Sequence, residues 1–153
     1  MSNLRAFNHT VNIVAYNKNE INYGASIAWA MQVDYDKLLL LMGCQSVTGN
    51  NIEVGDKIGV SALSINQKHI AMCFGDGHSD EKNKFVNVNI NQNESAITIQ
   101  DASREMICEV MEIVSLKEIE EDRLIYVKVL SYKENNDQFL NYIAFLETES
   151  AGE

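Results

Sequence analysis

Residues 37–55 read KLLLLMGCQSVTGNNIEVG, and this stretch decides the fold. The run from Lys37 to Gly43 is apolar and short, so it fits a strand buried on both faces better than a helix. The segment from Ser46 to Gly55 begins with a hydroxyl residue and ends with glycine, which is typical of a short helix. The stretch therefore predicts a buried strand followed at once by a short helix.

Alternating apolar and polar residues lie on both sides of this stretch and predict further strands. Apolar residues at helical spacing then predict a second helix, which Gly75 closes. The expected elements are a half-buried strand over Val11–Ala15, a strand from Tyr23 to about Met31, a strand over Lys57–Ala62, and a helix carrying Ile65, His69, Ile70, Met72 and Phe74.

The C-terminal half returns to strands. The segments 106–114 and 124–130 are long and β-branched and predict an antiparallel hairpin, with the acidic segment 117–123 as its turn. A last strand is expected from Phe139 to Phe145, before a tail at 150–153. Many strands with a few short helices predict a mainly β, antiparallel barrel in a single domain spanning residues 1–153.

The composition narrows the function. Twelve Lys and Arg against 22 Asp and Glu leave a net charge of −10. This charge argues against binding nucleic acid or an anionic membrane surface, although it permits one small phosphate ligand. No apolar run is long enough to span a membrane or form a signal core, so we expect a cytoplasmic protein. The three cysteines form no CxxC pair and are expected to be reduced and mostly buried.

The sequence contains no recognisable catalytic or metal-binding motif. It lacks Gly-x-Ser-x-Gly, His-Glu-x-x-His, a Walker loop and the Rossmann glycine pattern, so neither catalytic side chains nor metal ligands are predicted. His9 and His69 lie in or beside expected structural elements. His78 lies in a long polar loop over 75–83 and is the one histidine that we assign as a candidate substrate-site residue.

Two segments have properties expected of a cofactor site. Residues 24–29, GASIAW, are small and strand-like, so a flat ring could approach their backbone and bond to Ser26. Residues 43–48, GCQSVT, open the short helix, where hydroxyls and amides could form an anion pocket. The alternative for the second segment is helix capping by Ser46 or Thr48, which the local pattern favours.

The order of these pieces resembles the flavin reductase-like family, the FMN-binding split barrels. The order is a strand with Gly-x-Ser-x-x-Trp, a hydrophobic strand, Ser-x-Thr opening a short helix, a strand ending in Ser-x-Leu, a helix ending in Phe-Gly, a polar loop, and Lys-Phe. The resemblance is good from Val11 to Phe85 and looser over the hairpin after Met106.

The resemblance implies an antiparallel split barrel with a few short helices that binds FMN, in a homodimer with FMN near the interface. It places residues 25–28 along the isoalloxazine and ribityl groups, residues 45–48 at the phosphate, and the pair after the polar loop near the flavin, where a lysine could offset negative charge. The implied cofactor-binding residues are Ala25, Ser26, Ile27, Ala28, Trp29, Gln45, Ser46, Val47, Thr48, Lys84 and Phe85.

One difference from the family pattern leaves the electron donor of the flavin undecided. Reductases of this family carry Gly-Asp-His in a late hairpin turn, where the histidine helps to place the nicotinamide, and the corresponding turn here is expected at 121–123, Glu-Asp-Arg. The leading expectation is hydride transfer from NAD(P)H to FMN. The alternatives are an FMN-bound electron carrier that is reduced by a protein partner, which the acidic surface would suit, and a split-barrel domain that binds a ligand without catalysis.

Overall fold

The structure, a computed structural model, describes residues 4–75 and 84–151. Within these residues the chain forms three helices and nine strands, and the strands join one antiparallel sheet. The sheet order is β3-β4-β9-β8-β5-β1-β7-β6, with β2 paired to β1. The elements are β1 (Asn12–Lys18), β2 (Ile21–Ile27), β3 (Ala30–Asp34), β4 (Lys37–Met42), α1 (Val47–Asn50), β5 (Lys57–Ala62), α2 (Lys68–Gly75), β6 (Ile90–Asn93), β7 (Ala96–Ile99), β8 (Arg104–Leu116), β9 (Ile119–Glu134) and α4 (Tyr142–Ala151).

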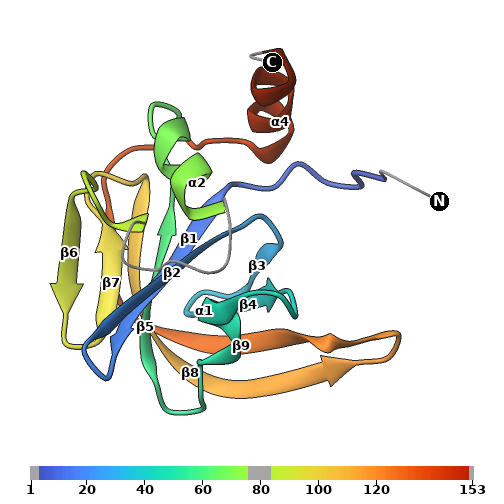
Figure 1. Cartoon of the computed structure of the whole chain (residues 1–153), viewed down its shortest axis with the longest axis vertical. Coiled ribbons are helices and arrows are strands. Elements are labelled where there is room, and N and C mark those ends of the chain that lie inside the picture. Colours follow the sequence, from blue (N-terminus) through green and yellow to red (C-terminus); the bar gives the residue numbers. More distant parts are fainter. Residues whose placement is uncertain (1–3, 76–83, 152–153) are drawn as a thin grey trace.

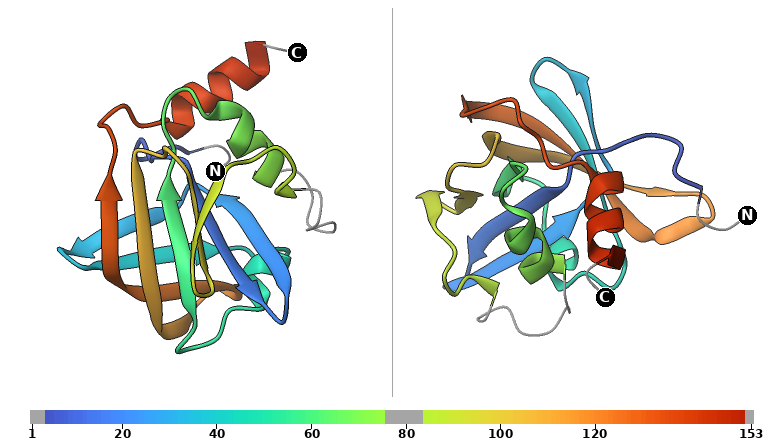
Figure 2. Two further views of the ribbon diagram at one scale, coloured as in Figure 1. Left: turned by 90° about the vertical axis from the view of Figure 1, so that its left-hand side faces the viewer. Right: turned by 90° about the horizontal axis from the view of Figure 1, so that it is seen from above.

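The sheet curls on itself, and the longer helices gather at one end. Figure 2 shows α2 and α4 side by side above the strands, while α1 lies apart from them, next to β4. The long β8–β9 hairpin extends away from the rest of the molecule (Figure 1). This architecture confirms a mainly β, antiparallel fold with a few short helices.

Strand β1 separates two hydrophobic cores. Val14 and Tyr16 point into the cluster enclosed by the curled sheet, whereas Ile13 and Ala15 point into a second cluster beneath α2 and the C-terminal segment. The strand predicted over Val11–Ala15 is therefore confirmed, but its description as half-buried was wrong. The face that the alternation assigned to solvent, with Asn12 and Val14, is instead buried, and Val14 belongs to the cluster that the curled sheet encloses.

The strand predicted from Tyr23 to Met31 is two strands. The chain bends at Ala28 and Trp29, so β2 pairs with β1 while β3 pairs with β4 at an edge of the sheet. The apolar run forms β4 as predicted, but every second residue is only partly buried, because one face of this strand lacks a full cover. The short helix is also shorter than predicted, since α1 spans only Val47–Asn50.

Helix α2 buries only some of the apolar side chains that were predicted to form its buried face. Ile70, Ala71 and Phe74 are buried, whereas Ile65 precedes the helix and is exposed, as is Met72. The apolar spacing therefore identified a helix correctly, and the start and the buried face were wrong. Only the positions that meet β1 and β2 are covered.

The C-terminal half confirms the predicted hairpin and corrects its turn. The turn is the pair Lys117-Glu118, and residues 121–123 lie inside β9, where Arg123 pairs with Met42 of β4. Strands β6 and β7 were missed. The expected last strand from Phe139 to Phe145 is instead a pair of isolated bridges followed by α4, which also includes the start of the expected tail.

No helix in the described ranges 4–75 and 84–151 is long and apolar enough to cross a membrane.

Candidate functional site

The end of β2 borders a cavity that brings together three of the predicted cofactor residues. Ser26, Ile27 and Ala28 line a space of about 480 Å³ beneath α2 and α4. The remaining lining is mostly apolar and consists of Val11, Ala71, Met72, Gly75, Tyr142, Phe145 and Leu146. Ligand pockets of small molecules commonly have this volume and this mixture of an apolar lining with a few polar groups.

Two neighbours of these residues lie elsewhere. Ala25 packs against the cluster enclosed by the sheet, because alternate side chains of a strand point to opposite faces. Trp29 lies in the bend between β2 and β3, is 60% exposed, and borders a neighbouring cavity of about 640 Å³ beside the N-terminal segment. The predicted row 25–29 is thus divided between the inner core, the cavity of Ser26, and the surface.

Gly24 serves the packing of the protein itself rather than the approach of a ligand ring. A Cβ atom at this position would lie 2.4 Å from Cε1 of Phe74 and 3.0 Å from Cζ of Phe85. The two phenyl rings meet edge to face, with 5.0 Å between their centroids. Phe85 therefore lies against β2, and the glycine makes room for aromatic side chains of this chain rather than for a ligand.

Lys84, like its neighbour Phe85, contacts β2 at Gly24. Its side chain is buried, and its ammonium Nζ donates to the carbonyl oxygen of Gly24 at 2.9 Å. This bond shows that the Gly24 carbonyl points away from β1. Because backbone groups of alternate residues in a strand point the same way, the N–H and C=O of Ser26 also face the outer edge, where the cavity lies.

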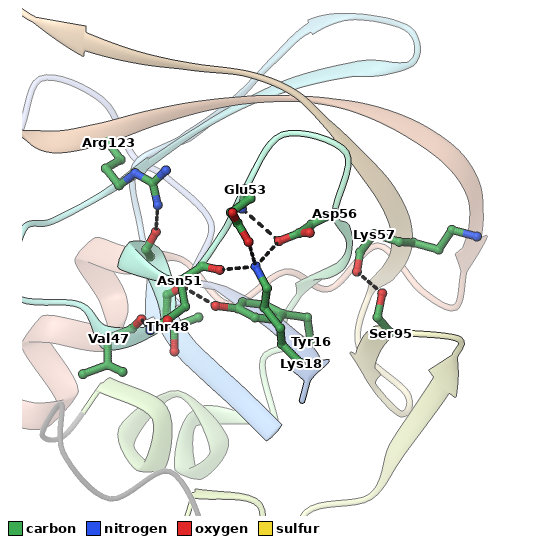
Figure 3. A network of polar contacts seen from close by, with 11 residues as sticks. Tyr16, Lys18, Val47, Thr48, Asn51, Glu53, Asp56, Lys57, Ser95 and Arg123 are labelled. Atoms are coloured by element: carbon green, nitrogen blue, oxygen red, sulfur yellow. Dashed lines mark hydrogen bonds and ion pairs between the residues drawn. The ribbon is translucent and has the colours of Figure 1, made fainter. Parts of the chain in front are cut away.

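The residues predicted to bind phosphate lie in the loop before α1, which holds Gln45 and Ser46, and at the start of α1, which holds Val47 and Thr48. Ser46 is the N-cap of α1, and its hydroxyl accepts from the Gly49 amide at 2.9 Å, so the capping role is confirmed for this residue. The Thr48 hydroxyl is buried and has no hydrogen-bond partner among the described residues, although its carbonyl accepts from the Tyr16 hydroxyl at 2.6 Å (Figure 3). Gln45 is exposed and Val47 is partly buried.

Two residues of β9 hold this loop, and sequence reasoning missed them. The Asp122 carboxylate accepts from the amide of Cys44 at 3.0 Å. The Arg123 guanidinium donates to the carbonyl of Gly49, and Figure 3 shows this contact. The contacts follow from the pairing of β9 with β4, which brings Arg123 beside Met42 just before the loop. No sequence pattern marks that register, since it depends on strands more than 70 residues apart.

The histidines and cysteines form no catalytic group within the described residues. His69 is exposed on α2, and His9 lines a different, larger cavity of about 830 Å³. His78 lies outside the described residues. Cys44 and Cys73 are exposed, which corrects the expectation of mostly buried cysteines, whereas burial raises the pKa of the Cys108 thiol to about 12. Within residues 4–75 and 84–151, no three His, Cys, Asp or Glu side chains could share a metal ion.

Strand β2 connects the two groups of predicted residues, although none of residues 45–48 lines the cavity of Ser26. Strand β2 packs against α2 on the side of the cavity and also against α1, which carries the Thr48 hydroxyl without a partner in the described chain. A buried hydroxyl without a hydrogen bond is costly, so a polar ligand atom at this position would be stabilising.

Comparisons with known proteins point to one family. The family described as "Flavin reductase like domain" matches residues 4–146. A protein classed as a flavin reductase from Haemophilus somnus 129PT has a TM-score of 0.78 at 18% identity, covering 89% of this chain and 87% of its own. The NADH:FAD oxidoreductase SgcE6 of Streptomyces globisporus has a TM-score of 0.73 at 17% identity, covering 84% and 76%.

A flavoredoxin from Methanosarcina acetivorans has a TM-score of 0.74 at 12% identity, covering 88% of this chain and 73% of its own. No curated protein has a significant sequence match to this chain. At these identities the solved structures show the fold alone, and the fold is the predicted split barrel. Because the family matches almost the whole length, the chain belongs to the flavin reductase like domain family.

Proposed function

We propose that this protein binds FMN and transfers a hydride to it from NADH or NADPH. The cavity of about 480 Å³ beside Ser26, Ile27 and Ala28 carries the proposal. It lies beside the outer edge of β2 and is large enough for a ring system, in a chain that belongs to the flavin reductase like domain family. Hydride transfer to a flavin needs no acid or base from the protein, and this agrees with a sequence that contains no recognisable catalytic motif.

The chemistry would come from the flavin, which accepts a hydride at N5 from a reduced nicotinamide. The protein would bind and orient it. The Ser26 N–H and C=O would hold the polar edge of the ring, and Phe145 and Leu146 of α4, together with α2, would exclude water from one side. Ser46 and Thr48 would lie at the phosphate, and the buried Lys84 ammonium would add positive charge beside β2.

A second function is favoured by a specific observation. The turn of the late hairpin, Lys117-Glu118, contains no histidine, and one structural neighbour is a flavoredoxin. An electron carrier reduced by a protein partner would need no nicotinamide site, and the net charge of −10 suits a basic partner. A third alternative is a domain that binds a ligand without catalysis or that has lost its flavin, and a domain without flavin would lack the visible spectrum described next.

The first experiment is a visible absorbance spectrum of the purified protein, with and without added FMN, followed by anaerobic NADH and NADPH. Bleaching of bound flavin by a nicotinamide is the expected result. A flavin spectrum that survives both donors and bleaches with dithionite would replace the reductase with the electron carrier. A colourless protein that takes up neither FMN nor FAD would overturn both functions.

The phosphate assignment has its own test. Replacing Thr48 by valine removes the partnerless hydroxyl while keeping the shape of the side chain. We expect Thr48→Val to bind FMN about tenfold more weakly and riboflavin, which lacks the phosphate, with unchanged affinity. Equal affinities of variant and wild type for FMN would remove Thr48 from the site.

Three further properties belong to the same proposal. A homodimer is expected from the family, and light scattering coupled to size-exclusion chromatography would measure its mass. A single domain over residues 1–153 is supported by one family match from 4 to 146. A cytoplasmic location remains the expectation drawn from the sequence.

A further inference from the structure

We propose that the adjacent residues Asp122 and Arg123 tune the affinity of loop 43–50 for the flavin phosphate, with Arg123 strengthening binding and Asp122 weakening it. This inference rests on the proposed function, because residues 45–48 are the phosphate segment of that proposal. It assigns a role to two β9 residues that form no part of the expected site.

The geometry places both charges at the loop. The Asp122 carboxylate bonds to the Cys44 amide at the start of the loop, and the Arg123 guanidinium bonds to the Gly49 carbonyl near its end. Loop 43–50 contains the single turn of α1, and four helical residues extend over only about 6 Å. Cys44 lies two residues before Ser46 and Gly49 directly follows Thr48, so a phosphate at Ser46 and Thr48 would lie close to both bonded side chains.

Neither charge is neutralised in the described chain. Asp122 and Arg123 are each partly buried, and neither makes an ion pair with another described residue. Arginine has five N–H donors, and Gly49 accepts from one nitrogen, so the guanidinium retains donors for an anion. The Asp122 carboxylate occupies an amide that could otherwise bond to a phosphate, and its charge repels one.

A purely structural role would predict a different pattern. If the two residues only held the loop in place, loss of either one would loosen the loop and weaken the binding of every flavin. If their charges act on the phosphate, the two variants should change FMN affinity in opposite directions and leave riboflavin affinity unchanged. The sign of the Asp122 effect therefore separates the two roles.

The experiment measures dissociation constants for FMN and riboflavin, by flavin fluorescence, in full-length wild type and in Asp122→Asn, Arg123→Gln and Arg123→Lys. Asparagine keeps an oxygen that can accept from the Cys44 amide, and lysine keeps the positive charge. We expect Asp122→Asn to bind FMN about tenfold more tightly and Arg123→Gln about tenfold more weakly, with Arg123→Lys between Arg123→Gln and wild type. Riboflavin should bind all four proteins alike.

Three outcomes would overturn the inference. Weaker binding of both flavins by Asp122→Asn would show that the residue only holds the loop. An unchanged ratio of FMN to riboflavin affinity in all variants would remove both charges from the phosphate site while leaving the proposed function intact. Failure of wild type to bind either flavin would reject the proposed function itself. If Arg123→Gln does not fold, as judged by circular dichroism, Asp122→Asn and Arg123→Lys still decide the sign.

Discussion

Glu105 on β8 is a carboxylate that is only 5% exposed and is surrounded by neutral donors. Burial by itself would raise its pKa, but hydrogen bonds from Asn91, Asn135 and Thr98, with the nearby charge of Lys133, outweigh burial and hold the pKa below its ordinary value. The bonds join β6, β7 and the segment after β9 to β8. The carboxylate thus connects strands that are remote in the sequence.

The lowered pKa of Glu105 predicts the direction of a pH effect on stability. As pH falls, the unfolded chain, in which the pKa of Glu is about 4.3, takes up the proton before the folded protein does. The contribution of Glu105 is therefore complete above this value and is lost as pH falls through the lower, folded pKa. Urea unfolding of wild type at pH 7, 4.5 and 3.5 should show this loss.

Glu105→Gln is the matching variant. We expect it to lose about 2 kcal/mol of unfolding free energy at pH 7, because an amide donor would then face other donors, and to depend less on pH below 4.5 than wild type does. Glu112→Gln, at an exposed position of the same strand, is the control and should follow wild type. Identical pH profiles for wild type and Glu105→Gln would contradict the role given to this carboxylate.

Gly59 on β5 lies where the backbones of β5 and β7 approach each other closely. A Cβ atom at this position would lie 1.9 Å from the carbonyl oxygen of Ile97, and backbone atoms of a strand have little freedom to move aside. We expect Gly59→Ala to lower the unfolding free energy by about 3 kcal/mol in urea. Gly43→Ala is the matched control, since its Cβ would meet only Asp122, at 3.9 Å, and its stability should change by less than about 0.5 kcal/mol.

At the scale of elements, β1 and β3 should differ most in local stability. β1 is paired with β2 and β5, touches β7, and is buried on both faces, whereas β3 is an edge strand with a mostly exposed surface. Native-state hydrogen exchange should therefore find the amides of β1 among the slowest in the chain and those of β3 much faster. Exchange of β1 at the rate of β3 would show that the two cores do not protect the strand between them.

The elements that sequence patterns predicted well are those with long, one-sided or continuous apolar runs. β4, β5, β8 and β9 carry such runs, and the strand at β1 was found although its second face was misjudged. β6 was missed because Asn91, Gln92 and Asn93 carry no apolar signal. For α4, Tyr142, Phe145 and Leu146 do recur at helical spacing, and this pattern could have identified the helix in place of the expected strand.

The residues of the candidate site also differ in whether a local sequence pattern marks them. Ser26, which lines the cavity, and Ser46, which caps α1, could be singled out because a small-residue strand and a capping position are local patterns. Asp122 and Arg123 were misplaced in a turn because acidic residues favour turns, while the actual turn at Lys117-Glu118 depends on how far β8 and β9 extend. Glu118 adopts a positive φ of 75° there, which a charged residue gives no reason to expect.

At the scale of the whole molecule, the excess of acidic residues predicts where the protein loses solubility. The isoelectric point of about 4.7 lies just above the range in which Glu105 stops contributing to stability. Net charge near zero removes the repulsion between copies, so we expect light scattering to rise sharply near pH 4.7 and to stay low at pH 8. Clear solutions at pH 4.7 would show that the charge of the folded surface differs from that of the whole sequence.

The β8–β9 hairpin suggests where this chain could be lengthened. Its tip at Lys117-Glu118 is exposed, far from the cavity of Ser26, and the hairpin already absorbs three shifts in register along its length (Figure 1). A peptide inserted at the tip would leave the pairing of Arg123 with Met42 intact, whereas one extra residue directly after Arg123 would turn Ile125 and Val127 out of the core. The tip is therefore the natural attachment point for an epitope or a spectroscopic label, and the strand behind it tolerates no such graft.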